Sequence, residues 1–237
     1  MGDFVANESK ETAALLDRAG KGDGRAVGEL FALHQERLRR MVQVRMDRRL
    51  QGRLNPSDVL QEAFLEVSKA LAEYLGNPAI PFFLWLRLIT GRKLHTLHRH
   101  HLGAHVRDAG REVSLHRGAL PQASSESLAA QLLGRFTSPS QVAVRAELQI
   151  RVQEALNSMD PLDREVLALR HFEQLSNSEI AQVLRISESA ASNRFVRALE
   201  RLKNILTSVS DLLDDRPKKG MGTKRRDKGE ARGGKSP

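Results

Sequence analysis

The sequence predicts an all-α fold of two small helical domains, and three observations support this. Helix-start signals recur along the chain, whereas the alternating apolar pattern of strands is nearly missing. Apolar residues follow these signals at the three-to-four spacing of a helix that buries one face. Aromatic residues make up only 4% of the 237 residues, which suits a compact helical bundle better than a β-sandwich or barrel.

The helix starts are specific enough to place in the sequence. Three segments put Asn, Ser or Asp directly before a proline, the order that caps a helix N-terminus and fixes its first residue. A fourth segment is a capping box, in which a serine and a glutamate three residues later accept hydrogen bonds from each other's backbone N–H groups. The segments are Asn55-Pro56-Ser57-Asp58, Ser138-Pro139-Ser140-Gln141, Asp160-Pro161-Leu162-Asp163 and Ser176-Asn177-Ser178-Glu179.

These signals divide the chain into two helical blocks, residues 11–107 and 138–213, and we expect each to be a domain. Residues 108–137 between them have the Gly, Pro and polar composition of a flexible linker, with a short helix near Leu128–Leu133. Residues 214–237 are rich in Lys, Arg and Gly and hold too little apolar surface to fold, so we expect a disordered basic tail.

Most of the net charge lies in this tail. The formal net charge is +9 and the sequence pI is about 10.3. Residues 216–237 hold nine Lys or Arg against two Asp or Glu, whereas the other 215 residues hold 29 against 27. The total charge is therefore weak support for a nucleic-acid partner, and the local distribution of charge must decide.

The composition also excludes some classes of site. The sequence has no cysteine, which rules out disulfides and thiolate metal sites. No apolar run approaches the roughly 20 residues of a membrane span, and Met1–Lys10 lacks a signal-peptide pattern. We expect a cytoplasmic protein with no cofactor and no metal.

Residues Ser176–Lys203 have the pattern of a helix–turn–helix. A short amphipathic helix over 179–184 precedes a turn and a long helix that Ser187 caps. Arg185 stands where such turns commonly go left-handed, which costs a non-glycine residue about 1 kcal/mol. Either the turn is looser than usual or the helix stops one residue earlier. The expected supporting helices cover 141–157 and 161–174.

The second helix carries chemistry suited to DNA. Its inner face is apolar, and its outer face has short polar residues near the N-terminus for base edges and arginines for guanine or phosphate. Asn193 has the amide that pairs with adenine, and Arg197 the guanidinium that pairs with guanine. The competing interpretation is a solvated face with ordinary charges. The candidate contacts are Ser189, Ser192, Asn193, Arg194, Arg197 and Arg201.

An earlier helix has an exposed face of a different kind. Asp58, Gln61, Glu62 and Leu65 recur at helical spacing, so they share one side. A surface of carboxylate, amide and leucine suits docking onto a basic helical partner. A solvated acidic face is the alternative.

The stretch from Tyr74 to Arg107 combines cations with aromatic rings. It contains no acidic residue, five Lys or Arg and five of the eight histidines. Cations hold phosphates and rings stack on unpaired bases, as melting of a duplex requires. Phe82 and Trp85 also suit a core, so base contact is expected mainly in the loop Gly76–Pro81. The candidate contacts are Tyr74, Asn77, Phe83, Trp85, Arg87, Arg92, Lys93 and Arg99.

Four histidines in this stretch suggest two further interpretations. His95, His98, His101 and His105 lie near one helix face. Zinc sites usually add a carboxylate or cysteine, and none is nearby in the sequence. A pH-sensitive phosphate-binding face, charging near about pH 6.5, is the better interpretation.

Three motifs resemble the sigma-70 family of RNA polymerase sigma factors. Asn55–Leu65 resembles the D-x-x-Q-E-x-F-L signature of region 2.2, Phe83–Ile89 resembles F-x-x-W-L-x-x-I of region 2.3, and Leu175–Ala181 resembles L-S-x-x-E-I-A of region 4. Regions 2 and 4 with nothing sizeable between them resemble the minimal extracytoplasmic-function (ECF) class. The resemblance covers residues 11–107 and 138–207.

This resemblance implies a promoter-specificity subunit that performs no covalent chemistry. Region 2 would bind core RNA polymerase and open the −10 element, and region 4 would read the −35 element. Asp58, Gln61, Glu62 and Leu65 would contact the β′ clamp helices, and region 4 the β flap. The family often has asparagine where this chain has Arg92, and a cation there favours phosphate binding. An anti-sigma factor or another regulator would control such a protein, which works at the nucleoid when bound to polymerase.

Two other classes of protein remain as alternatives. A one-component regulator would join the helix–turn–helix to a sensing or dimerising domain and bind a palindromic site, but it has no use for the Asp58–Leu65 face. A metal hydrolase would use the histidines, but it lacks a convincing carboxylate partner or nucleophile.

Overall fold

The computed structural model describes residues 2–50, 52–102, 121–134 and 142–214. Every regular element in these ranges is helical, which confirms the predicted all-α class. None of the helices described is long and apolar enough to cross a membrane. The start signal at Ser138, most of the predicted linker and nearly all of the predicted basic tail lie outside the described residues.

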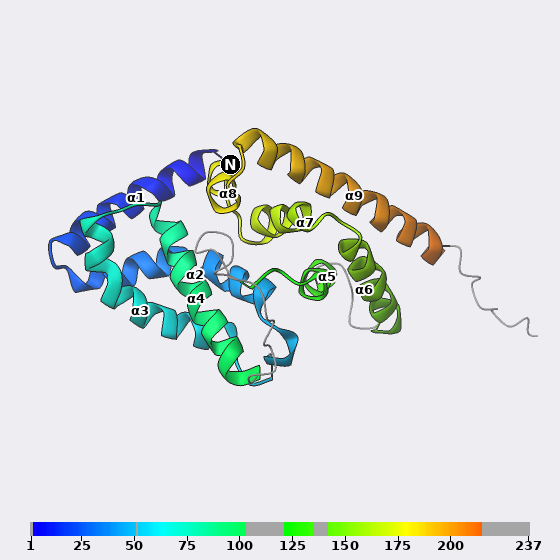
Figure 1. The fold of residues 1–237 in the computed structure, drawn as a ribbon, viewed down its shortest axis with the longest axis horizontal. Coiled ribbons are helices and arrows are strands. Elements are labelled where there is room, and N and C mark those ends of the chain that lie inside the picture. Colours follow the sequence, from blue (N-terminus) through cyan, green and yellow to red (C-terminus); the bar gives the residue numbers. More distant parts are fainter. Residues whose placement is uncertain (1, 51, 103–120, 135–141, 215–237) are drawn as a thin grey trace, which may run out of the picture.

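The N-terminal block consists of four helices and one short turn. They are α1 (Gly2–Gly20), α2 (Gly24–Arg45), the 3-10 turn η1 (Arg48–Leu50), α3 (Pro56–Gly76) and α4 (Phe82–Leu102). The chain reverses between α1 and α2 at Gly22, whose φ of 87° favours glycine, and α2 then runs back along α1 (Figure 1). Leu30, Leu38 and Met41 of α2 are fully buried against α3 and α4.

The described part of the C-terminal block is also entirely helical in its regular elements. It consists of α5 (Ser125–Gly134), α6 (Val142–Asn157), α7 (Pro161–Leu167), the π-helical turn η3 (Ala168–Phe172), α8 (Asn177–Leu184) and α9 (Glu188–Asp214). The helix predicted over 161–174 therefore exists, but its last turn widens to π geometry, and Gln174 follows with a φ of 59°.

Helix α5 is the short helix predicted near Leu128–Leu133, and it is tightly packed. Leu128 and Ala129 are fully buried, and they share a core cluster with Val152 and Leu156 of α6. The described end of the predicted linker is thus a helix of the C-terminal block.

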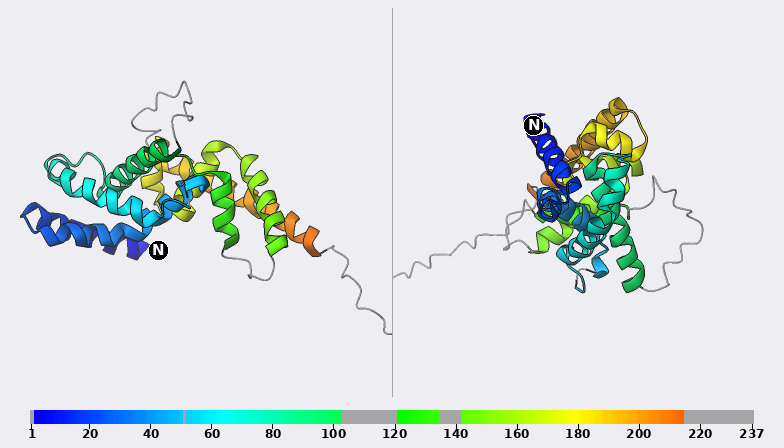
Figure 2. Two further views of the ribbon diagram at one scale, coloured as in Figure 1. Left: turned by 90° about the horizontal axis from the view of Figure 1, so that it is seen from below. Right: turned by 90° about the vertical axis from the view of Figure 1, so that its left-hand side faces the viewer.

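The two blocks pack against each other. A single core cluster joins N-terminal residues such as Leu38 and Phe83 to Leu169, Leu175 and Ile180 of the C-terminal block. Two views at right angles show α8 and η3 beside α2, while α6 and α9 extend away from the N-terminal helices (Figures 1 and 2). The chain is therefore in a closed arrangement.

Three charged side chains are buried where the blocks meet, and a fourth, Glu165, is half-buried beside them. Glu173, which follows η3 and is 0% exposed, accepts hydrogen bonds from Nε of Arg45 and Nε of Arg87, both at 2.7 Å. Arg45 also donates to Glu165 of α7 at 2.5 Å. Arg45 and Arg87 come from α2 and α4, whereas both carboxylates come from the C-terminal block.

Charge pairing keeps Glu173 and Arg45 ionised despite their burial. Burial alone would raise the pKa of Glu173, but the charges of Arg45 and Arg87 outweigh it and hold the pKa below its ordinary value. Burial would likewise lower the pKa of Arg45, but Glu165 and Glu173 raise it. Because the pKa of Glu173 is depressed, its contribution to the closed arrangement is present above the ordinary value of about 4.3 and is lost as the pH falls through the lowered pKa.

Helix α3 begins at the predicted residue because its N-terminus is doubly capped. Asn55 accepts from the backbone N–H of Asp58 at 3.1 Å, and the Asp58 carboxylate accepts from the backbone N–H of Asn55 at 2.9 Å. Pro56 at the first helical position adds a fixed φ without losing an intrahelical hydrogen bond.

Replacing Asn55 with alanine should lower the free energy of unfolding by about 1 kcal/mol, because α3 loses its N-cap. Urea denaturation followed by circular dichroism measures this change. The control is Asn204→Ala, an exposed position within α9, which should stay within about 0.5 kcal/mol of the unmodified chain. Equal losses for both variants would contradict the capping role.

Candidate nucleic-acid interface

The helix–turn–helix has the predicted local chemistry. Ser176 and Glu179 form the expected capping box at the start of α8. Arg185 ends that helix in the left-handed conformation, with φ 54° and ψ 48°, so the chain turns where the sequence predicted. Ser187 then caps α9 by accepting from the backbone N–H of Ala190 at 3.1 Å.

Helix α9 presents one face to the core and one to solvent. Ala191, Ala198 and Leu202 are buried, as the apolar periodicity predicted, and Phe195 packs partly against the core. The opposite face is open. Of the six candidate contacts on α9, Ser189, Asn193, Arg197 and Arg201 are exposed, and Ser192 and Arg194 are half-buried.

Two carboxylates of the N-terminal turn of α7 divide the arginines of α9 into two kinds. Arg194 lies 2.5 Å from Oδ1 of Asp163 and 3.5 Å from Asp160, so its charge is largely met within the protein. Nη2 of Arg197 is 4.0 Å from Oδ1 of Asp163, the longest distance at which an ion pair forms, and its side chain is 61% exposed. Arg197 is therefore better placed than Arg194 to reach a base edge.

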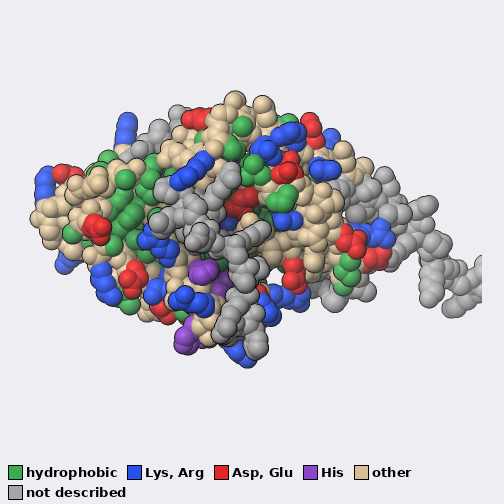
Figure 3. Space-filling view, viewed as in Figure 1, with side chains coloured by type: hydrophobic (Ala, Val, Ile, Leu, Met, Phe, Trp, Pro, Cys, Tyr) green, Lys and Arg blue, Asp and Glu red, His purple; other side chains and the backbone are tan. Residues whose placement is uncertain are grey.

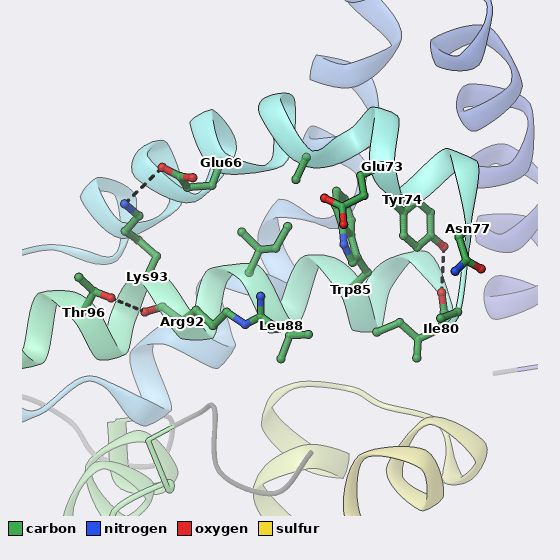
Figure 4. A pocket seen from close by; sticks show the side chains of 13 residues that line it. Glu66, Glu73, Tyr74, Asn77, Ile80, Trp85, Leu88, Arg92, Lys93 and Thr96 are labelled. Atoms are coloured by element: carbon green, nitrogen blue, oxygen red, sulfur yellow. Dashed lines mark hydrogen bonds and ion pairs between the residues drawn. The ribbon is translucent and has the colours of Figure 1, made fainter. Parts of the chain in front are cut away.

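A cavity of about 740 Å³ opens between α3 and α4. Figure 4 shows side chains from the facing sides of both helices around it, with Asn77 and Ile80 in the loop that joins them. Tyr74 donates from its hydroxyl to the carbonyl of Ile80 at 2.9 Å, which fixes this loop. The candidate contacts that line the cavity are Tyr74, Asn77, Trp85, Arg92 and Lys93.

The cavity combines an aromatic wall with cations. Trp85 stacks on Tyr74 with ring centroids 4.6 Å apart and remains partly exposed. Arg92 is exposed and has no ion pair among the residues described. Lys93 is 3.3 Å from Glu62 and 3.7 Å from Glu66, so its charge is shared with α3.

Three other candidates of the N-terminal block lie outside this cavity. Arg99 is exposed farther along α4. Phe83 is buried, with the Arg37 guanidinium 3.5 Å above its ring. Arg87 is 4% exposed and bound to Glu173. In this arrangement Phe83 and Arg87 do not face solvent as a DNA contact must, because Arg37 of α2 covers the ring of Phe83 and Glu173 of the C-terminal block binds Arg87.

The predicted protein-docking face on α3 is exposed at three of its four positions. Gln61 and Glu62 are open to solvent, and Leu65 is 55% exposed, an unusual exposure for a leucine on a helix. Asp58 differs because its carboxylate serves the capping box of α3. Its side chain therefore contributes to the helix start whatever else it contacts.

The histidines of α4 gather with Lys and Arg at the lower edge of the molecule (Figure 3). His98 accepts from the backbone N–H of Asp47 at 3.3 Å, and burial lowers its pKa, so protonation of this ring near neutral pH is disfavoured. Within the described ranges, no three His, Asp or Glu side chains come together as metal ligands. His105 lies outside the described residues.

The sequence reasoning did not single out four residues that shape these surfaces. They are Arg45, Glu173, Asp163 and Arg37. Asp163 was identified only as part of a helix start, yet it also holds Arg194, 31 residues away. Each of these four residues contacts a residue far away in the sequence, so no local spacing rule predicts the contact.

Comparison with known proteins agrees with this geometry. Residues 149–202 match the family model of Sigma-70, region 4, which spans the helices α6 to α9. The chain is 27% identical over 192 residues to the RNA polymerase sigma-H factor of Pseudomonas aeruginosa, covering 81% of this chain and 92% of that protein. The ECF RNA polymerase sigma factor SigD of Mycobacterium tuberculosis is 27% identical over 198 residues, covering 84% and 85%.

A third relative is matched over almost its whole length. The ECF RNA polymerase sigma-E factor of Escherichia coli is 26% identical over 202 residues, covering 84% of this chain and 95% of that protein. The chain is thus similar, over most of its length, to ECF sigma factors of the sigma-70 family. Among solved structures, CnrH in complex with the cytosolic domain of CnrY is 25% identical, with a TM-score of 0.48 and coverage of 84% and 98%.

The chain carries a strained residue, Arg185, at the centre of its helix–turn–helix, and the strain is measurable. Replacing Arg185 with glycine should raise the free energy of unfolding by about 1 kcal/mol relative to Arg185→Ala, because glycine adopts the left-handed conformation without the Cβ clash. Both variants lose the same exposed side chain, so alanine is the matched control. Equal stability in urea denaturation would contradict the cost assigned to this turn.

Proposed function

We propose that this sigma factor reads a promoter at two points while attached to core RNA polymerase. Residues 11–107 would bind the polymerase and open the −10 element, and residues 138–213 would read the −35 element. The observation that carries the proposal is the presence of two separate DNA-suited surfaces, the α3–α4 cavity and the outer face of α9, beside one exposed protein-docking face.

The α3–α4 cavity suits a base that has left the duplex. Its volume of about 740 Å³ falls within the range of about 300–1,000 Å³ typical of small-molecule sites. Trp85, which Tyr74 backs, offers a partly exposed ring for stacking, worth about 1–3 kcal/mol per base, and Asn77 offers an exposed amide. Arg92 beside them would hold a phosphate.

Promoter recognition of this kind needs binding energy and no covalent step. We therefore propose that the chain is not an enzyme and acts in the cytoplasm with the transcription machinery. Each of the two readers is weak alone, and joining them on one chain raises affinity through effective concentration. A bacterial core polymerase with run-off transcription tests this directly, because a chain that neither bound core enzyme nor directed initiation at any promoter would refute the proposal.

The docking face can be tested without disturbing the fold of α3. Leu65→Asp should weaken core binding at least about tenfold, because it replaces the exposed leucine of the face with a charge. Asp58 is left intact since its removal would also uncap the helix. Fluorescence anisotropy with labelled chain measures the affinity.

The matched control is Ala72→Asp, an exposed position two turns farther along α3. It adds the same charge outside the proposed face and should leave core affinity unchanged. If both variants bound core enzyme as the unmodified chain does, the docking face would lie elsewhere.

Arg197→Ala should relax base preference at one position of the −35 element at a cost of about 1–3 kcal/mol, because a bidentate contact to guanine is lost. Arg197→Lys is the control that keeps the charge and removes the fork geometry. It should lose the same base preference, but its loss of total DNA affinity should be smaller than that of Arg197→Ala. Binding to a set of single-base −35 variants measures this. A uniform loss across all sequences would identify a phosphate contact instead.

A further inference from the structure

The acid at the third position of α7 differs from its counterparts in two other capped helices. In α3 and α8 this acid, Asp58 or Glu179, accepts from the backbone N–H of its own N-cap residue. In α7 the N-cap Asp160 accepts from the backbone N–H groups of Leu162 and Asp163, at 2.8 and 3.3 Å. Among the described residues, no backbone N–H donates to the carboxylate of Asp163 in return. This carboxylate is therefore available to another helix.

Asp163 faces α9, the second helix of the helix–turn–helix, which packs along α7 (Figure 1). Oδ1 of Asp163 accepts from Nη1 of Arg194 at 2.5 Å and lies 4.0 Å from Nη2 of Arg197. The two arginines are three residues apart, so they lie on the same side of α9. One oxygen of a carboxylate that is only 14% exposed thus faces both guanidinium groups.

The two arginines differ in how much of each guanidinium is left for DNA. Arg194 is 26% exposed and has a second acid, Asp160, at 3.5 Å. Arg197 is 61% exposed and has only one nitrogen near Asp163. A guanidinium is a planar fork of five N–H donors, so a carboxylate at one edge leaves another edge for a bidentate partner. The O6 and N7 atoms of guanine form such a partner.

We propose that Asp163 is a positioning residue for recognition of the −35 element. Its carboxylate holds Arg194 away from the DNA backbone and orients Arg197 toward a base edge. The surface of α9 thereby gains base preference and loses affinity for DNA of any sequence. This inference rests on the proposed function, and it places no contact between Asp163 and DNA.

An acid beside a DNA-facing helix lowers affinity for every duplex. The carboxylate repels phosphates and also neutralises the guanidinium that it binds. Each phosphate that a protein cation neutralises contributes about 0.9 to the slope of log K against log salt. While Asp163 holds Arg194, α9 therefore makes one phosphate contact fewer than its sequence offers.

Orientation of Arg197 makes its choice between bases sharper. An unrestrained arginine loses rotamer freedom when it docks on a base, and it can move to a phosphate when the matching base is absent. A guanidinium that a carboxylate already orients loses less freedom at the matching base and is less able to reach the backbone. Both effects increase the difference in affinity between the matching base and any other.

Asp163→Asn removes the charge and keeps the shape of the side chain. In the holoenzyme, preference at the −35 position that Arg197→Ala relaxes should fall roughly three- to tenfold, measured by competition among single-base −35 variants. In the free full chain, the salt slope on a duplex without promoter elements should steepen by about 0.9, because Arg194 becomes free to bind a phosphate. A contribution to folding alone would lower affinity for all sequences and leave the base preference unchanged.

The matched control is Glu200→Gln, which removes one negative charge from α9 itself. Glu200 is exposed and has no ion pair in the part of the chain that the structure describes. Its loss should leave the base preference unchanged. Adding Arg194→Gln to Asp163→Asn should return the salt slope to that of the unmodified chain, because the freed cation is gone. A slope that stayed steep in this double variant would overturn the role assigned to Arg194.

Arg194→Gln alone keeps the test decisive if Asp163→Asn loses helicity. It leaves the charge of Asp163 unpaired beside the duplex, so affinity should fall for every sequence while the salt slope stays the same. A slope shallower by about 0.9 would show that Arg194 binds a phosphate in the unmodified chain and would overturn the proposal. Full base preference in a folded Asp163→Asn holoenzyme would do so too. Failure of the unmodified chain to direct run-off transcription would instead refute the proposed function.

Discussion

The carboxylate of Glu173 is the interaction on which the arrangement of this molecule depends. A buried charge is tolerated only where opposite charges meet it, and the two that do so come from α2 and α4. Among the residues that the structure describes, neither arginine is paired with an acid of the N-terminal block. Glu165, the second partner of Arg45, also belongs to the C-terminal block. Each block thus buries groups that only the other can satisfy, so the closed arrangement is specified by charge as well as by apolar contact.

The local elements of the fold were predictable because their causes lie within a few residues. Asn55 and Asp58 cap each other across three positions, and so do Ser176 and Glu179. The spacing of the helix–turn–helix placed the left-handed position at Arg185, and although a looser turn or an earlier helix end was expected there, Arg185 adopts that conformation. Even α5, within a segment of linker composition, was marked by its apolar cluster. Capping and periodicity are short-range effects, so the sequence displays them directly.

The role of Arg87 was not predictable for the opposite reason. It lies in a stretch with no acidic residue, which suggested a free cation facing DNA, but its partner is 86 residues away. The partner of Arg45 is 128 residues away. Charged residues are rarely buried, so a sequence gives no sign of the few that are. The same holds for Asp163, whose contact with Arg194 depends on how α7 meets α9.

These long-range pairs also explain how a nearly neutral folded part can be selective for DNA. Arg45, Arg87, Lys93 and Arg194 are each committed to carboxylates, which leaves little uncompensated charge to attract any duplex without regard to sequence. Arg92 and Arg197 remain exposed, one at the α3–α4 cavity and one on α9. Because nonspecific affinity grows with the number of free cations, pairing Arg45, Arg87 and Arg194 with carboxylates lowers that affinity.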